Sequence, residues 1–122
     1  MPDPRRLLIV DDHPLLGEVI SDVAVALGFE VVVARSADEF RNAFEKFLPT
    51  HVVIDLEMPV EGGAGLIHWV GSKASPPKII LMSGNSTLLH ETFTAASTLR
   101  IPIAAALPKP STLAAIREAL LR

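Results

Sequence analysis

The stretch "LLIVDDHP", residues 7–14, places four apolar residues directly before two adjacent carboxylates, Asp11 and Asp12. A short apolar run rich in branched residues is typical of a buried strand. Two neighbouring carboxylates repel each other and are costly to desolvate, so the pair needs either open water or a cation. The stretch therefore predicts a buried strand that ends at an acidic edge.

Similar short runs recur along the chain and alternate with longer segments of helical periodicity. The predicted strands are Arg6–Val10, Glu30–Ala34, His51–Asp55, Lys78–Met82 and Ile103–Leu107. The predicted helices are Pro14–Leu27, Ala37–Phe47, Gly63–Ser72, Thr87–Leu99 and Thr112–Leu121. This alternation predicts an α/β fold with a parallel sheet. Because the strands are mostly apolar on both faces, we expect helices to cover both faces of the sheet.

Helix boundaries carry their own chemical signals. Gly28 follows the first predicted helix, which is a common helix end. Ser36 with Glu39 three residues later predicts a capped start for the second helix, and Ser111 is the predicted cap of the last.

Composition narrows the class of protein. A chain of 122 residues, 49% hydrophobic and 20% charged, predicts one compact domain over residues 1–122. A net charge of -3 gives no electrostatic reason to bind nucleic acid or an acidic membrane surface, and the absence of cysteine excludes disulfides. No apolar run is long enough for a bilayer, and "MPDPRR", residues 1–6, lacks the apolar stretch of a signal peptide. We expect a soluble, cytoplasmic protein.

The polar residues that end the predicted strands form one set. Asp11 and Asp12 follow the first strand, Asp55 ends the third, Ser83 follows the fourth and Lys109 follows the fifth. Ligands of open parallel sheets bind beyond the carboxyl ends of the strands, so these side chains are expected to meet. The three carboxylates offer the hard oxygen ligands that suit Mg²⁺, which would offset their repulsion.

This set matches what phosphoryl transfer to a carboxylate requires. The transferred group spreads negative charge over its oxygens, so the protein has to position it and surround it with positive charge and donors. Asp55, expected at an exposed edge, is the predicted nucleophile, and Lys109 and Ser83 are predicted to hold phosphoryl oxygens.

Each of these residues also has an ordinary structural explanation. Asp11 or Asp12 would serve as a cap for the helix that opens at Pro14, and Asp55 and Ser83 suit simple turns. Lys109 is harder to explain in that way, because prolines on both sides stiffen the backbone and remove two amide donors. Its bond to Pro110 is also one of the few that adopts a cis peptide at low cost.

Four motifs in this order, "LLIVDDHP", "HVVIDLEMP", "ILMSGN" and "LPKP", resemble the receiver domain of two-component response regulators over essentially the whole chain. The resemblance implies a doubly wound five-stranded sheet of order 2-1-3-4-5. It also implies phosphorylation by a sensor histidine kinase or a phosphotransfer protein. The implied roles are Asp55 as phosphoacceptor, Asp11 and Asp12 as the acidic Mg²⁺ pair, Ser83 as switch hydroxyl, Lys109 as the lysine of the site and the Glu57 backbone carbonyl as a further metal ligand.

One departure from the family pattern concerns the switch. Receivers usually carry Tyr or Phe three residues before the lysine, and this chain has Ala106 there. The segment "ASTLRIPIAAALPKP", residues 96–110, is similar to receivers that are joined to a cyclic-di-GMP phosphodiesterase, which allows a C-terminal output domain beyond residue 122.

Two rival functions stay open beside a phosphorylation-operated switch that is not a conventional enzyme. A small phosphatase of the haloacid dehalogenase type also uses Asp, Ser or Thr, Lys and Mg²⁺. That family places DxD after its first strand, whereas this chain has the adjacent pair Asp11 and Asp12 there and its acceptor after the third strand. A degenerate receiver that only binds partners is the other rival, and the intact Asp, Ser and Lys set argues against it.

The histidines give no separate signal. His13, His51, His68 and His90 lack the spacing of metal ligands, so a zinc site is not predicted. His68 is expected on a solvated helix face, and Trp69 beside it is expected to be half-buried.

Overall fold

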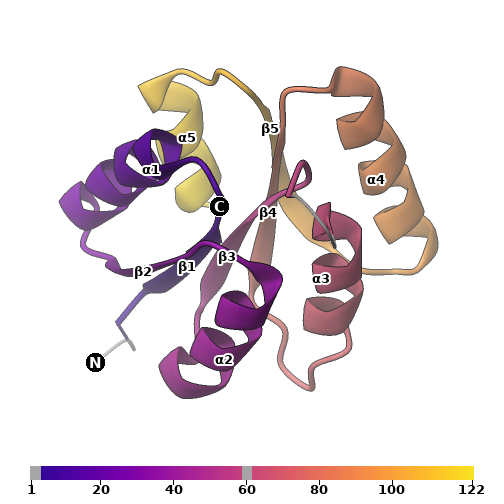
Figure 1. Ribbon diagram of the computed structural model, residues 1–122, viewed down its shortest axis with the longest axis horizontal. Coiled ribbons are helices and arrows are strands. Elements are labelled where there is room, and N and C mark those ends of the chain that lie inside the picture. Colours follow the sequence, from indigo (N-terminus) through magenta and orange to yellow (C-terminus); the bar gives the residue numbers. More distant parts are fainter. Residues whose placement is uncertain (1–3, 59–61) are drawn as a thin grey trace.

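The computed structural model describes residues 4–58 and 62–122, in which strands and helices alternate five times (Figure 1). The strands are β1 (Arg6–Val10), β2 (Glu30–Ala34), β3 (His51–Asp55), β4 (Lys78–Ser83) and β5 (Ile103–Pro108). The helices are α1 (Pro14–Ala26), α2 (Ala37–Phe47), α3 (Gly62–Gly71), α4 (Ser86–Thr98) and α5 (Leu113–Leu120). Every predicted element is present, with ends that differ by at most one residue.

All strand pairs are parallel, and the sheet order is β2-β1-β3-β4-β5, as the resemblance implied. Strand β2 lies on one side of β1, and the chain then places β3, β4 and β5 in succession on the other side. Ile9 in β1 accordingly lies between Val33 of β2 and Val53 of β3. Such a reversal leaves a crevice beyond the carboxyl ends of the two central strands, which is where ligands of this architecture bind.

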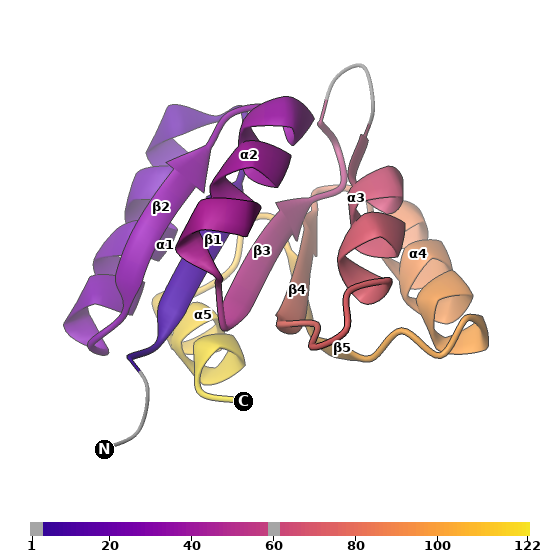
Figure 2. The same ribbon diagram turned by 90° about the horizontal axis from the view of Figure 1, so that it is seen from below.

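Helices cover both faces of the sheet, as Figure 2 shows in the second view. The core on one face gathers residues of α2, α3 and α4, including Phe40, Leu66 and Ala96. The core on the other gathers residues of α1 and α5, including Ile20 and Ile116. Strand β1 contributes side chains to both cores, because its alternate side chains point to opposite faces of the sheet.

Strand β2 is covered on both faces, by α1 and α2, as expected, but less completely than the central strands. This strand lies at the edge of the sheet, where Glu30 and Val33 are exposed and Val31 and Val32 are half-buried. An edge strand has a neighbour on one side only, so the helices that flank the central strands cover it incompletely.

Two of the three predicted helix boundaries are confirmed. The Ser36 hydroxyl accepts from the Glu39 amide at 3.1 Å, and Gly28 has a positive φ of 91° just beyond α1. The prediction that Ser111 caps the last helix is wrong. Its hydroxyl donates back to the Pro108 carbonyl, and Thr112 caps α5 instead by accepting from the Ala115 amide at 3.0 Å.

Trp69 is half-buried and His68 is exposed, as predicted. The indole packs edge-on against Phe44 at 5.1 Å between ring centroids, and the Lys73 ammonium lies 3.8 Å from the indole centroid. Trp69 thus joins α3 to α2 as part of the core rim.

No helix within residues 4–58 and 62–122 is long and apolar enough to cross a membrane. The segment in which no signal peptide is predicted includes residues 1–3, which lie outside the described residues.

His51 is a buried titratable group at the amino end of β3, the edge of the sheet opposite to Asp55. Its ring packs edge-on against Phe29, and Nδ1 lies 2.8 Å from the Thr50 hydroxyl. Burial lowers the pKa of His51 to about 4, and the charges of Lys78 and Arg5 act in the same direction. The folded protein therefore holds this imidazole neutral over a pH range in which the unfolded chain is protonated.

We predict that the free energy of unfolding falls as the pH drops from about 6.5 to about 4, by up to roughly 3 kcal/mol from His51 alone. The unfolded state binds the proton first in this window, so acid favours unfolding. Denaturant titrations of the wild type and of His51→Gln isolate the contribution of the imidazole. In the variant, the free energy of unfolding should depend less on pH over this range. An equal pH dependence for both proteins would contradict a buried, neutral His51.

Candidate functional site

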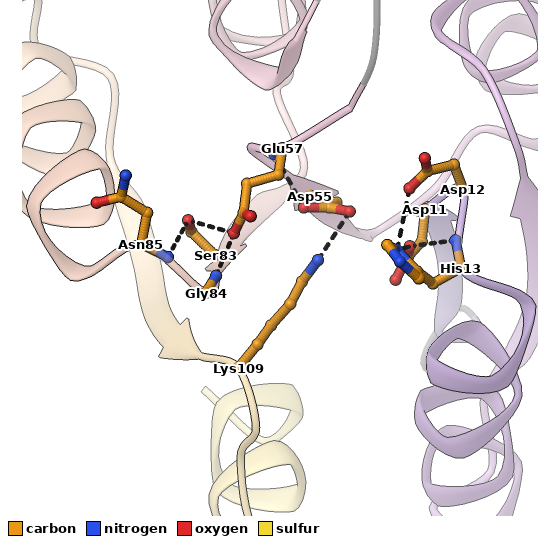
Figure 3. A network of polar contacts seen from close by, with 9 residues as sticks. All are labelled: Asp11, Asp12, His13, Asp55, Glu57, Ser83, Gly84, Asn85 and Lys109. Atoms are coloured by element: carbon orange, nitrogen blue, oxygen red, sulfur yellow. Dashed lines mark hydrogen bonds and ion pairs between the residues drawn. The ribbon is translucent and has the colours of Figure 1, made fainter.

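Backbone hydrogen bonds of the sheet hold the predicted site residues at its carboxyl edge. The Asp11 amide donates to the Ala34 backbone carbonyl at 3.1 Å, and the Lys109 amide donates to the Ser83 backbone carbonyl at 2.9 Å. Asp55 is the last residue of β3 and pairs with Met82 of β4. The structure thus brings together Asp11, Asp12, Asp55, Ser83 and Lys109, as the strand ends predicted (Figure 3).

The same local turn orients three of these side chains. In each, the side-chain oxygen accepts a hydrogen bond from the amide two residues further along the chain. The bonds run to Asp11 Oδ1 from His13 (2.7 Å), to Asp55 Oδ1 from Glu57 (2.9 Å) and to Ser83 Oγ from Asn85 (2.9 Å). The turn explanation is therefore correct for one oxygen of Asp55 and for the Ser83 hydroxyl, and Asp11 adopts the same turn. The capping explanation is wrong for α1, whose N-cap is His13 without a side-chain cap.

The second carboxylate oxygen of Asp55 is oriented differently. Oδ2 pairs with the Lys109 ammonium at 2.9 Å, and no other donor among the described residues contacts it. The expectation of an exposed Asp55 is wrong, because the residue is only 1% exposed. Helix α3 covers it closely: a Cβ on Gly63 would lie 2.9 Å from the Asp55 carbonyl oxygen. The buried oxygen keeps its capacity to bond to an incoming group.

Asp11 is the second buried carboxylate, at 3% exposure, whereas Asp12 beside it is open to solvent. Burial raises the pKa of Asp11, and the negative charge of Asp55 raises it further. The hydrogen bond from His13 and the positive charge of Lys109 oppose that rise without cancelling it. The site accordingly stores repulsion between two carboxylates, which a cation would relieve.

One tight acidic cluster combines the predicted carboxylates with a histidine that the sequence analysis set aside. Ligand atoms of Asp11, Asp12, His13 and Asp55 all lie within 4.8 Å of one another. His13 Nδ1 lies 3.2 Å from Asp12 Oδ1. His13 lies in this cluster because it directly follows the acidic pair in the sequence.

The Glu57 side chain is another participant that sequence reasoning missed. Its Oε1 accepts from the Ser83 hydroxyl at 2.8 Å and also from the Gly84 amide. These two bonds, the Ser83 bond first, lower the pKa of Glu57, although its side chain is exposed. The resemblance to receiver domains implied a role only for the backbone carbonyl of Glu57.

An open hollow of about 300 Å³ gives access to these groups. Its lining consists of His13, Leu15, Leu16, Glu57 and Lys109. A small anion and part of a partner side chain fit such a space. The site is thus a buried carboxylate paired with a lysine, next to an acidic cluster and open to solvent at one side.

A parallel α/β sheet with an acidic cluster beyond its strand ends defines a class of ligand-binding domains, and comparison with known proteins specifies the family. The model of the response regulator receiver domain matches residues 7–121. The chain belongs to this family, whose members are signalling switches of two-component systems. That assignment sets aside the haloacid dehalogenase alternative.

Individual relatives agree with this assignment. A probable transcriptional regulator, ycf27, of Pyropia yezoensis is 29% identical over 77 residues, which is 63% of this chain and 32% of that relative. The chain thus spans about a third of the length of the first curated relatives that it matches.

Solved structures support the fold. A CheY-like receiver domain protein from Methanospirillum hungatei superposes with a TM-score of 0.85 at 23% identity, covering 98% of this chain and 92% of the other. A response regulator from Burkholderia pseudomallei, solved with a phosphorylated aspartic acid, a calcium ion and citrate, gives a TM-score of 0.78 at 18% identity. In that case 95% of this chain and 66% of the other are covered.

We predict that Asp11→Asn stabilises the metal-free protein by about 1 kcal/mol at pH 7. The raised pKa of Asp11 means that the unfolded chain releases this proton at a lower pH than the folded protein. Stability therefore falls as the pH rises through that interval, and the uncharged amide avoids this loss. Denaturant titrations in a chelator at pH 7 and at pH 3 measure the effect, which should disappear at the lower pH.

Asp22→Asn, on an exposed position of α1, is the matched control and should change stability by less than about 0.5 kcal/mol. A clear destabilisation by Asp11→Asn at pH 7 would show instead that the attraction to Lys109 outweighs the repulsion and burial.

Proposed function

We propose that this chain is a phosphoacceptor receiver domain that takes a phosphoryl group onto Asp55 and thereby changes its binding to a partner or output domain. The observation that carries the proposal is the environment of the Asp55 oxygen Oδ2. This oxygen is buried and pairs with the Lys109 ammonium at 2.9 Å, and no other donor among the described residues contacts it. A nucleophile in such a place is positioned and has an open bonding direction.

The proposed donor is a phosphohistidine of a sensor histidine kinase or phosphotransfer protein. Asp55 Oδ2 forms a bond to phosphorus as the bond between phosphorus and the donor imidazole nitrogen breaks. The imidazole leaves with the electron pair and takes up a proton, and Asp55 becomes an acyl phosphate. Hydrolysis later returns the carboxylate and releases inorganic phosphate. Throughout, the Lys109 ammonium balances negative charge on the phosphoryl oxygens.

Mg²⁺ is the proposed cofactor, and the residues present fit it. Asp11, Asp12 and Asp55 would supply carboxylate oxygens, and the Glu57 backbone carbonyl would supply a further ligand. Hard oxygen donors that lie close together are the ligands that this ion prefers. When bound, the ion would neutralise charge on the carboxylates and on the phosphoryl oxygens.

Ser83 is the proposed switch hydroxyl. It ends β4 beside the end of β3, so its hydroxyl is placed to donate to a phosphoryl oxygen on Asp55 after a local rearrangement. Ala106 pairs with Leu81 on the neighbouring strand and offers only a methyl group. We therefore expect the rearrangement of Ser83 to be transmitted through the loop after it rather than through an aromatic ring on β5.

Partner docking is proposed beside the hollow. Leu15, which lines it, has a side chain that is 77% exposed, and Val19 one turn further along α1 is also exposed. A donor that brings an imidazole to Asp55 would cover these apolar side chains. We further propose that the protein acts in the cytoplasm, binds no nucleic acid directly and serves a longer regulator with a C-terminal output domain, since its relatives are longer.

We predict that the wild type, incubated with Mg²⁺ and acetyl phosphate, gains one phosphoryl group, and that Asp55→Asn gains none. The substitution removes the attacking oxygen while preserving the size of the side chain. Intact mass spectrometry gives the number of groups per chain, and released phosphate gives turnover. Asp38→Asn, at an exposed position of α2, is the matched control and should label like the wild type.

The other outcomes separate the alternatives. Label retained on Asp55→Asn would contradict the proposed acceptor. Turnover of many equivalents without a labelled intermediate would indicate a phosphatase. A wild type that neither labels nor turns over would indicate a receiver that acts only by binding.

A further inference from the structure

Two neighbouring donors at the end of β4 converge on a single carboxylate oxygen. The Ser83 hydroxyl donates to Glu57 Oε1 at 2.8 Å, and the Gly84 amide donates to the same oxygen (Figure 3). A hydroxyl and an amide that point at one negatively charged oxygen are the elements of an oxyanion-binding site. The chain thus fills a small anion site with its own side chain.

The position of this anion site matters for Asp55. Asp55 pairs with Met82 in the sheet, so the donors of Ser83 and Gly84 follow directly beyond the pairing partner of the acceptor. The Asn85 amide donates to Ser83 Oγ at 2.9 Å, so the lone-pair side of this hydroxyl is also engaged. A serine hydroxyl has one proton. That proton cannot be donated to Glu57 and to a phosphoryl oxygen at the same time.

We propose that the Glu57 carboxylate is an internal competitor of the phosphoryl group, which holds the Ser83 hydroxyl and the Gly84 amide until phosphorylation displaces it. The proposal rests on the proposed phosphorylation of Asp55. Glu57 is in this account a positioning residue, because it acts through Ser83 and Gly84. Its side chain is exposed, so the displaced carboxylate moves into water at little cost.

The residue after Ser83 suits this arrangement. A Cβ on Gly84 would lie 3.2 Å from Glu57 Oε1, which is closer than ordinary contact, so glycine leaves room for the carboxylate. Asn85 then caps the start of α4, with its side chain accepting from the Leu88 amide at 3.0 Å. Release of Glu57 therefore frees the segment that joins β4 to α4, and the start of α4 would report the phosphorylated state.

The test is a titration of the Mg²⁺-saturated protein with beryllofluoride, a phosphoryl mimic, monitored by NMR signals of the backbone amides and of the side-chain carboxyl carbons. We expect Glu57→Ala to bind beryllofluoride about tenfold more tightly than the wild type, because no charge-assisted bonds to Glu57 have to be broken. Glu57→Gln, which keeps an acceptor but no charge, should lie between them. In the wild type, the Gly84 amide and the Glu57 side-chain carboxyl carbon should both shift on binding.

Two controls separate competition from general effects. Glu91→Ala removes one exposed negative charge on α4 without touching Ser83 and should stay within about twofold of the wild type. In a Ser83→Ala background, the gain from Glu57→Ala should shrink, because the shared hydroxyl is gone.

Equal or weaker binding by Glu57→Ala, compared with the wild type, would overturn the competition. A gain of the same size from Glu91→Ala would overturn it as well. Absence of beryllofluoride binding in every protein, with no labelling of Asp55, would instead contradict the proposed function itself.

Discussion

The arrangement of the whole site depends on the repulsion between two buried carboxylates, Asp11 and Asp55. Neighbouring central strands deliver them to the same edge, since β1 and β3 are paired and both end there. Lys109, brought in by β5 from the far side of the sheet, contacts Asp55 and offsets part of the repulsion. The remaining excess of negative charge favours a divalent cation at this edge, which is the basis of the proposed Mg²⁺ site.

The fold holds these charges by repeating one local device. Asp11, Asp55 and Ser83 each accept a hydrogen bond from the amide two residues on, so each strand turns sharply out of the sheet with its side chain fixed. Such a turn engages one carboxylate oxygen or one lone pair of the hydroxyl. The other carboxylate oxygen, or the hydroxyl proton, stays available for other contacts. The second carboxylate oxygen of Asp55 faces Lys109, whereas the Ser83 hydroxyl donates its proton to Glu57.

Much of this arrangement could be predicted from the sequence, because apolar periodicity locates strands and parallel topology gathers their ends. That reasoning placed Asp55, Ser83 and Lys109 together. It failed where packing or single contacts decide: the burial of Asp55 depends on the close approach of Gly63, and the Glu57 bond depends on one rotamer of an exposed side chain. The partial exposure of β2 follows from its place at the edge, which composition alone does not reveal.

The most direct measurement of the central claim is thermal unfolding as a function of Mg²⁺ at constant ionic strength, for the wild type and for Asp12→Ala. A ligand that binds only the folded state stabilises it, by about 2.7 kcal/mol at a hundredfold excess over Kd. The account predicts that the wild-type Tm rises by on the order of 10 °C at that excess and that Asp12→Ala loses most of the rise. A wild-type Tm that does not depend on Mg²⁺ would contradict it.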